Sequence, residues 1–135
     1  MRVMLDGGAY TPKRAHPTDA GLDLRAKEGF EIAPYNMVVV DTGVHVALPE
    51  GTVGFIKSKS GLMAQGITAD GTIDEPYRGS IRVVMFNHTR ERKHFAHGDK
   101  IAQLVVQPVR YESVQIVDAL DKTDRGENGF GSTGK

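Results

Sequence analysis

Short apolar runs separated by turn-forming residues make up most of this chain of 135 residues. The runs are rich in β-branched residues and too short for typical helices, so we expect strands rather than helices. Many short strands between turns indicate an all-β sandwich, jelly roll or barrel. The predicted strands are Asn36–Val40, Val44–Leu48, Thr52–Lys57, Ser80–Asn87, Ile101–Val109 and Val114–Leu120. Turns are predicted at residues 41–43 and 49–51, and a short helical turn at residues 61–66.

Two of the predicted strands, Ser80–Asn87 and Ile101–Val109, carry apolar residues at consecutive positions. Consecutive apolar residues are typical of strands that are buried on both faces. In a domain this small, a partner subunit can cover one of those faces. The pattern therefore leaves a monomer and an oligomer both open.

Composition places the chain among globular proteins of one domain, with 39% hydrophobic and 25% charged residues. Seventeen basic residues balance seventeen acidic ones. This balance argues against broad binding to nucleic acid or to anionic membranes, but it is compatible with a local basic pocket for a small anion. The absence of cysteine excludes disulfides and thiol catalysis.

No apolar run approaches the roughly 20 residues that span a bilayer. The first residues, Met1–Met4, do not form the long apolar stretch of a signal peptide. From these features we expect a soluble, cytoplasmic protein.

Two glycine-containing stretches carry charged side chains that are candidates for a binding site. In Ala20–Leu24 (AGLDL), Asp23 lies between two leucines and either faces solvent or points into a polar site. In Lys57–Gly61 (KSKSG), ammonium groups, hydroxyls and backbone N–H groups could grip a phosphate. The alternative for this second stretch is a solvated basic turn.

Two further stretches place polar side chains near turns. The pattern of Gly71–Gly79 (GTIDEPYRG) predicts a hairpin. In it, Asp74 could serve as a general base and Tyr77 could pack against a sugar or a nucleobase. The alternative is a surface hairpin with an internal Asp–Arg ion pair of little consequence. Gln103 lies in an otherwise apolar strand, where its amide is either satisfied structurally or faces a ligand.

The glycine-rich segment Arg125–Lys135 (RGENGFGSTGK) matches parts of two nucleotide-binding patterns. Both patterns require a different context, namely a strand before a dinucleotide loop, and Ser or Thr after the lysine of a P-loop. Arg125 can hold a phosphate through two donors, and Phe130 can stack on a base. By itself, a polar glycine-rich terminus is more typical of a disordered tail.

Taken in order, the stretches AGLDL, KSGL, GTIDEPYRG, GDKIAQL and RGENGFGSTG resemble the five motifs of the trimeric deoxyuridine triphosphate nucleotidohydrolases (dUTPases). The resemblance runs from Pro12 to Gly134. It implies an all-β, jelly-roll-like (β-clip) subunit that forms a homotrimer with sites at subunit interfaces. It also implies an all-β domain over residues 1–123 and a flexible lid over residues 124–135 that completes a site on a neighbouring subunit.

The activity implied by the resemblance is hydrolysis of dUTP to dUMP and pyrophosphate with Mg²⁺, which lowers dUTP and supplies dUMP for thymidylate synthesis. The implied catalytic residues are Asp74, Asp23, Ser60, Gln103 and Arg125. The implied substrate-binding residues are Lys59, Ser60, Gly61, Thr72, Ile73, Asp74, Tyr77, Arg82, Gln103, Arg125, Phe130, Gly131, Ser132 and Thr133. Asp23 would hold waters on a Mg²⁺ ion that is bound mainly by the substrate phosphates.

Within that scheme, Asp74 would deprotonate the attacking water and Tyr77 would lie under the deoxyribose, leaving no room for a 2′-hydroxyl. Arg125 would pair with the terminal phosphate and Phe130 would cover the base. The chain departs from the usual motifs at Lys59, where arginine is common, and lysine lacks the planar fork of arginine. Pro76 is a further departure that stiffens the hairpin turn.

The implied partners are dUTP and two further copies of the chain, without nucleic acid or membrane. A regulatory protein partner stays open, and so does a dUTP-gated binding protein as an alternative function. A dCTP deaminase is disfavoured, because such enzymes carry a catalytic glutamate in the strand after the hairpin and Ser80–Asn87 contains no acid.

Overall fold

The computed structural model describes residues 1–129 and consists almost entirely of strands. The expected all-β class is therefore confirmed. In chain order the elements are β1 (Arg2–Leu5), β2 (Gly21–Arg25), β3 (Phe30–Ile32), β4 (Met37–Ala47), β5 (Thr52–Lys57), α1 (Ser60–Met63), β6 (Ile67–Ile73), β7 (Ser80–Asn87), β8 (Lys93–Phe95) and β9 (Lys100–Pro108).

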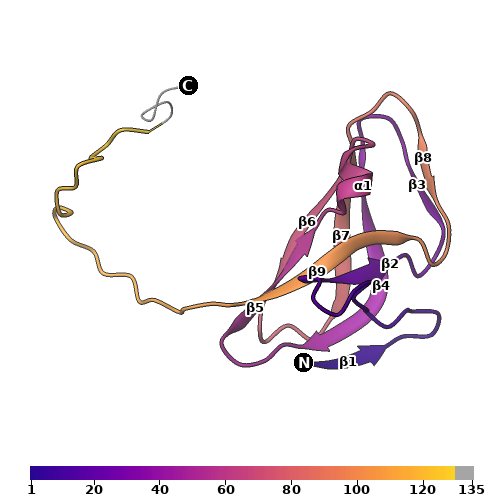
Figure 1. Ribbon diagram of the computed structural model, residues 1–135, viewed down its shortest axis with the longest axis horizontal. Coiled ribbons are helices and arrows are strands. Elements are labelled where there is room, and N and C mark those ends of the chain that lie inside the picture. Colours follow the sequence, from indigo (N-terminus) through magenta and orange to yellow (C-terminus); the bar gives the residue numbers. More distant parts are fainter. Residues whose placement is uncertain (130–135) are drawn as a thin grey trace.

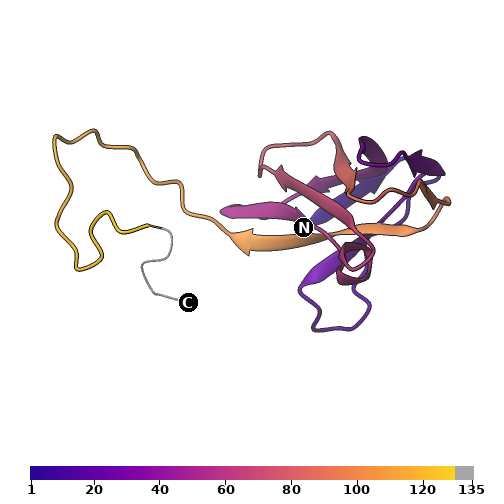
Figure 2. The same ribbon diagram turned by 90° about the horizontal axis from the view of Figure 1, so that it is seen from above.

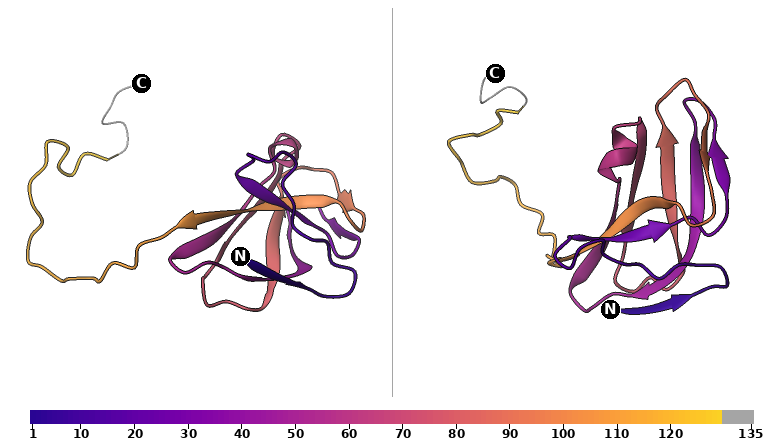
Figure 3. Two further views of the ribbon diagram at one scale, coloured as in Figure 1. Left: turned by 60° about the horizontal axis from the view of Figure 1, so that its bottom comes forward. Right: turned by 45° about the vertical axis from the view of Figure 1, so that its right-hand side comes forward.

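Seven strands form one antiparallel sheet in the order β1-β4-β7-β6-β5-β9-β2, and β3 pairs with β8 in a separate two-stranded ribbon. The large sheet is strongly curled, so that β9 and β2 run across β4 and β7 instead of alongside them (Figures 1 and 3). This curl encloses the core between the two ends of the sheet, as expected for a jelly-roll-like subunit. The fully buried side chains include Leu24, Ile56, Ile81, Met85 and Leu104.

The predicted turn at residues 41–43 is wrong, because β4 continues through it as one strand of 11 residues. Asp41 pairs with Arg82 and His45 pairs with Ser80, so four residue steps on β4 lie opposite two steps on β7. Gly43 lies in this bulge and adopts a φ of 65°, a left-handed conformation that favours glycine. The turn-forming residues therefore bend and twist the strand without ending it.

The predicted strand Val114–Leu120 is also wrong, because this segment has no regular structure and its side chains are exposed. A β-branched segment forms a strand only where another strand satisfies its backbone groups, and none of the strands among residues 1–129 pairs with it. After β9 the chain leaves the sheet and runs away from it (Figures 1 and 2). Residues 130–135 lie outside the described part of the chain.

Burial of β7 on both faces is not observed either. Its side chains alternate between buried and more exposed positions, and Phe86 is 43% exposed while Met85 is fully buried. Phe86 pairs with Met37 of β4, which is 45% exposed, and Val39 two positions on is 51% exposed. Together these three side chains form an apolar patch on the outer face of the sheet.

Among residues 1–129, no helix has the length and apolar character needed to cross a bilayer.

Candidate functional site

A row of directly paired residues brings three of the sequence motifs together across the sheet. Asp23 of β2 lies opposite Gln103 of β9, and Gln103 lies opposite Lys57 of β5. Side chains that pair directly across antiparallel strands point to the same face. The register therefore places AGLDL, KSKSG and GDKIAQL around one position on the sheet.

Asp23 is the centre of this cluster. Its carboxylate accepts a hydrogen bond from the Lys59 ammonium and another, at 2.6 Å, from the Lys100 ammonium. Its side chain is only 11% exposed, which excludes the solvent-facing alternative. Partial burial raises the pKa of Asp23, but the hydrogen bonds from Lys100 and Lys59 outweigh it and hold the pKa below its ordinary value.

The side chain of Gln103 lies over Gly21 of the AGLDL segment. Its side-chain amide donates to the carbonyl of Ser58 at 3.1 Å, so the amide is tied to the KSKSG segment. A Cβ atom at Gly21 would approach Oε1 of Gln103 to 2.2 Å. Only glycine at position 21 leaves room for this side chain, which gives the glycine of AGLDL a physical role.

The KSKSG segment is not a free basic turn. The Ser58 hydroxyl donates to the Ala69 carbonyl at 2.8 Å and accepts from the Ala69 N–H at 2.7 Å, which fastens the segment to β6. Lys59 occupies the N-cap position of α1, and the exposed residues Ser60 and Gly61 begin the helix. Backbone N–H groups in a first turn have no carbonyl partner inside the helix and can bind anionic oxygens.

A polar hollow of about 640 Å³ lies beside Asp23. Its charged lining residues are Lys13, Arg14, Asp23, Arg25 and Lys100. Four cations and one carboxylate make this hollow suitable for an anionic ligand. Sequence reasoning did not single out Lys100 or the other three cations, because basic residues in a chain of zero net charge carry no signal until the fold gathers them.

The hairpin between β6 and β7 holds a second group of candidates. Asp74 accepts the Tyr77 N–H through its backbone carbonyl at 3.0 Å, and the Tyr77 hydroxyl donates to the Ser80 carbonyl at 3.0 Å. The Asp74 side chain is exposed and the Tyr77 ring is 42% exposed. Arg78 donates to the carbonyls of Glu75 and Tyr77, so the proposed internal Asp–Arg pair is not the arrangement observed.

Glu75 anchors this hairpin and was not identified from the sequence. Its Oε2 accepts the Gly51 N–H at 2.8 Å and the Tyr111 hydroxyl at 2.7 Å. The Tyr111 hydroxyl, followed by the Gly51 N–H, lowers the pKa of Glu75. The hairpin is thereby joined both to the β4–β5 turn and to the segment that follows β9.

One chain does not bring the two groups of candidates together. Asp70 of β6 lies opposite Lys57 in the paired row. Asp74 lies four residues farther along, which corresponds to about 13 Å of strand. Lys59 contacts Asp23 and Gln103 pairs with it, and Ser60 and Gly61 follow Lys59 in α1. The residues Thr72, Ile73, Asp74 and Tyr77 belong to the distant hairpin.

The remaining candidates lie elsewhere. Arg82 is exposed on β7 opposite Asp41. Arg125 lies in the extended segment after β9, where its Nε donates to the carbonyl of Asn128 at 3.0 Å. The predicted nucleotide contacts Phe130, Gly131, Ser132 and Thr133 lie outside the described residues.

A metal would depend on the substrate for most of its ligands. Among residues 1–129, no three His, Cys, Asp or Glu side chains are close enough together to hold an ion. Mg²⁺ is often bound by one or two carboxylates together with substrate phosphates. Asp23, beside the basic hollow, fits this mode of binding.

Comparison with known proteins relates this geometry to one family. The dUTPase family profile matches residues 8–134. The deoxyuridine 5'-triphosphate nucleotidohydrolase of Corynebacterium glutamicum is 46% identical, over 98% of this chain and 93% of that protein. The corresponding protein of Nocardia farcinica is 47% identical, over 96% of this chain and 82% of that protein.

Solved structures agree with the sequence relatives. The dUTPase of Staphylococcus bacteriophage 80alpha, determined with dUpNHpp, matches with a TM-score of 0.89 and 30% identity, over 99% of this chain and 98% of that one. A mutant dUTPase from phage phi11 of S. aureus, described as revealing the coordination of a structural Mg(II) ion, has a TM-score of 0.81 and 28% identity, over 87% and 96% of the two chains. Sequence, fold and the ordered motifs thus agree, and the chain belongs to the dUTPase family.

Proposed function

We propose that this protein hydrolyses dUTP to dUMP and pyrophosphate, lowering dUTP and supplying dUMP for thymidylate synthesis. The observation that carries the proposal is the cluster of Asp23, Lys59, Lys100 and Gln103, in a chain that matches the dUTPase family over residues 8–134. This cluster combines cations for a triphosphate with a carboxylate suited to a phosphate-bound ion.

The phosphate end of the substrate would bind at this cluster. The ammonium groups of Lys59 and Lys100 would turn from Asp23 to the phosphate oxygens, with further hydrogen bonds from Ser60, Gly61 and Gln103. Asp23 would then hold waters on the metal. Bound by the phosphates, Mg²⁺ would neutralise charge on the departing pyrophosphate.

The hairpin would activate the attacking water and recognise the nucleoside. Asp74 would accept a proton from water as the water oxygen bonds to the α-phosphorus and the bond from that phosphorus to the bridging oxygen breaks. Tyr77 would lie under the deoxyribose, while the backbone at Thr72 and Ile73 would hydrogen-bond uracil. Arg82, close to the hairpin on β7, would add a phosphate contact.

A complete site requires more than one chain. Asp74 lies about 13 Å of strand beyond Asp70, which pairs with Lys57 in the row that leads to Asp23, so we infer that the hairpin of a neighbouring subunit supplies Asp74. The apolar patch formed by Met37, Val39 and Phe86 supports a contact between subunits. A homotrimer satisfies this requirement through repetition of one interface.

The segment after β9 would close the site. In this proposal residues 1–123 form the body and residues 124–135 form a lid that acts on a neighbouring subunit. Arg125 would pair with the terminal phosphate and Phe130 would cover the base, with Gly131, Ser132 and Thr133 around the phosphates. Closure of such a lid excludes water from the reacting phosphate. We place this activity in the cytoplasm.

The test is a pyrophosphate-release assay with dUTP, dCTP, dTTP and UTP, each with and without Mg²⁺. The proposal expects release from dUTP that depends on Mg²⁺, and far slower release from the other three nucleotides. Comparable hydrolysis of UTP would contradict the role of Tyr77. Ammonia release from dCTP would indicate a deaminase in place of a dUTPase.

A further inference from the structure

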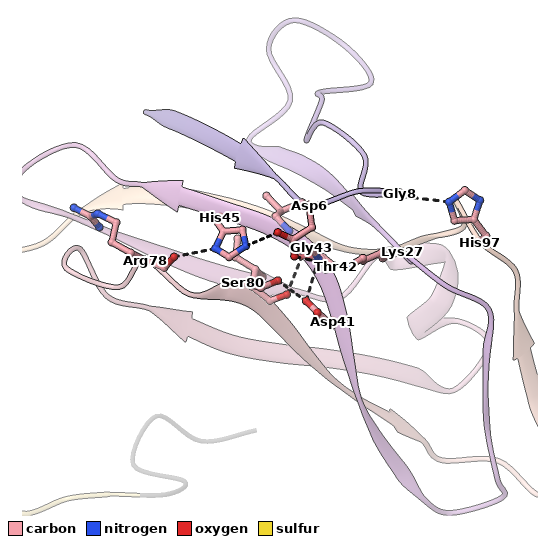
Figure 4. Close-up of polar contacts among 12 residues, drawn as sticks. Asp6, Gly8, Lys27, Asp41, Thr42, Gly43, His45, Arg78, Ser80 and His97 are labelled. Carbon is pink, nitrogen blue, oxygen red and sulfur yellow. Dashed lines mark hydrogen bonds and ion pairs between the residues drawn. The ribbon is translucent and has the colours of Figure 1, made fainter.

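His45 lies in the bulged part of β4 and joins two segments that are far apart in the sequence (Figure 4). Its Nδ1 lies 2.9 Å from the carbonyl oxygen of Arg78, in the hairpin turn. Its Nε2 lies 3.2 Å from Oδ1 of Asp6, directly after β1. The imidazole side chain is 18% exposed. One partly buried ring therefore bridges the hairpin and the N-terminal strand.

Both partners of the ring are hydrogen-bond acceptors. A neutral imidazole carries one N–H group, so it can donate to only one of the two oxygens, whereas an imidazolium can donate to both. The observed geometry is therefore satisfied in full only by the doubly protonated ring. The Arg78 carbonyl, followed by the Asp6 carboxylate, raises the pKa of His45 above its ordinary value, against the opposing effect of burial.

Charged groups on each neighbouring element surround this bridge. Lys27 approaches Asp6 at 3.5 Å and competes for its carboxylate. The carboxylate of Asp41 on β4 favours the imidazolium. The other cations nearby are Arg2 and Arg78, which line a shared hollow with His45, and Arg82, which lies opposite Asp41.

The bulge is built to hold the Asp6 side of the bridge in place. The Asp6 N–H donates to the Gly43 carbonyl at 2.9 Å. A Cβ atom at Gly43 would come within 2.9 Å of Ala9 and of Lys27, so the loop after β1 lies directly on this glycine. The Asp41 carboxylate meanwhile accepts the Gly43 N–H and the Ser80 hydroxyl, which joins the bulge to the start of β7.

The Arg78 side of the bridge belongs to the proposed catalytic hairpin. Arg78 follows Tyr77, whose N–H is bound to the carbonyl of Asp74. We propose that His45 is a positioning residue, whose imidazolium holds the hairpin carrying Asp74 and Tyr77 against β4 and the N-terminal strand, and whose deprotonation releases one side of this bridge. The consequence for catalysis rests on the proposed function, whereas the consequence for the hairpin itself does not.

The direction of the pH effect follows from the protonation of the ring. Because the folded pKa of His45 is raised, the bridge is complete below the ordinary imidazole pKa and is lost as the pH rises through the folded pKa. The hairpin should therefore loosen on the alkaline side. Turnover should acquire a descending alkaline limb, in addition to any acidic limb from the general base.

The first experiment measures hydrogen exchange of the Tyr77 amide in the nucleotide-free protein, as protection factors, at about pH 6 and about pH 9, which bracket histidine titration. Protection in the wild type should fall about tenfold at the higher pH, as for loss of one charge-assisted hydrogen bond. In His45→Gln, protection should not depend on pH. The control His94→Gln should behave as the wild type, since His94 is 71% exposed and lies on β8.

Asp6→Asn provides a variant that retains both ring contacts. A neutral imidazole can donate from Nδ1 to the Arg78 carbonyl and accept at Nε2 from the asparagine amide. Hairpin protection in Asp6→Asn should therefore stay high at about pH 9. This variant keeps the proposal open to refutation even if His45→Gln does not fold.

The second experiment compares the pH profiles of kcat and KM for dUTP. The alkaline limb should be absent in Asp6→Asn and present in His94→Gln. Equal wild-type protection at the two pH values, or an unchanged pH dependence in Asp6→Asn, would overturn the proposal. A wild-type protein that does not hydrolyse dUTP would refute the proposed function alone, because the exchange measurement needs no nucleotide.

Discussion

The Tyr111 hydroxyl donates a hydrogen bond of 2.7 Å to Oε2 of Glu75. Tyr111 lies just after β9, where the chain leaves the sheet, and Glu75 directly follows the candidate base Asp74. The start of the segment that leads from β9 to the proposed lid is thus attached to the hairpin of the same chain. The segment that follows β9 and the residue next to Asp74 therefore share one direct contact.

Replacing Tyr111 with phenylalanine should remove the hydrogen bond that attaches the segment after β9 to this hairpin. The pKa of Glu75 is held low first by the Tyr111 hydroxyl, so it should rise toward its ordinary value of 4.5 in Tyr111→Phe. The contact is complete above that value and is lost as the pH falls through the folded pKa. Carboxyl titration by NMR measures the shift, and Tyr35→Phe, in the distant β3–β4 connection, should leave Glu75 unchanged.

Asp74→Asn should retain nucleotide binding and lose turnover by about 10²–10⁴-fold, as expected when a general base is removed. Turnover is measured by pyrophosphate release, and binding by titration with a non-hydrolysable dUTP analogue. The matched control is Asp70→Asn on the same strand, whose carboxylate is 82% exposed and pairs with Lys57. Near-normal turnover in Asp74→Asn would show that another group activates the water.

Lys59→Gln should weaken binding of the same analogue roughly tenfold or more, since a charge-assisted hydrogen bond to phosphate is lost. The pKa of Asp23 should rise, because one of its two ammonium partners is removed. As a result, the stability that ionised Asp23 contributes should be lost at a higher pH on acidification. Calorimetry measures the binding and carboxyl NMR measures the pKa of Asp23. The Lys59→Arg variant should preserve the affinity for the analogue and the lowered pKa of Asp23.

Lys93→Gln serves as the control for position 59, because Lys93 of β8 pairs with Glu91 and not with Asp23. Unchanged affinity in Lys59→Gln would place the phosphate chain away from the cluster around Asp23.

Gly43→Ala should destabilise the fold more than Gly51→Ala. Both glycines have positive φ values, 65° and 70°, so both substitutions carry a backbone cost of about 1–3 kcal/mol. Only at Gly43 would the new methyl group meet neighbouring atoms, at 2.9 Å, whereas the space around Gly51 is open. Urea unfolding measures the difference, and equal losses would contradict the close seating of the loop after β1.

Deleting residues 124–135 should abolish dUTP turnover and leave the fold intact. The described part of this segment is exposed, and its hydrogen bonds run between residues three positions apart. Loss of exposed residues removes little buried area, so the melting temperature should stay unchanged. Circular dichroism, sedimentation and pyrophosphate release together test the prediction. Turnover that persists in the truncated protein would contradict it.

Local patterns allowed β4, β5, β7 and β9 to be predicted, because alternation and turn chemistry act over a few residues. The strands β1, β2, β3, β6 and β8 were not among the predicted ones. The interruption of β4 was mispredicted because Asp41, Thr42 and Gly43 have the same chemistry in a turn and in a bulge. Long-range contacts distinguish the two outcomes, among them the Thr42 hydroxyl bond to the Ile81 carbonyl, at 2.8 Å, and the pairing with β7. Val114–Leu120 was mispredicted because strand propensity cannot supply a partner strand.

Local patterns in the chain are enough to predict the all-β class, the order of the motifs and the candidates Asp23, Lys59 and Gln103. The fold brings Lys59 and Lys100 together on Asp23 and separates them from the hairpin with Asp74. It also places His45 between Asp6 and Arg78. These relationships depend on strand register and on a bulge between segments distant in sequence. Local residue preferences do not specify such long-range pairings, so only the folded chain reveals them.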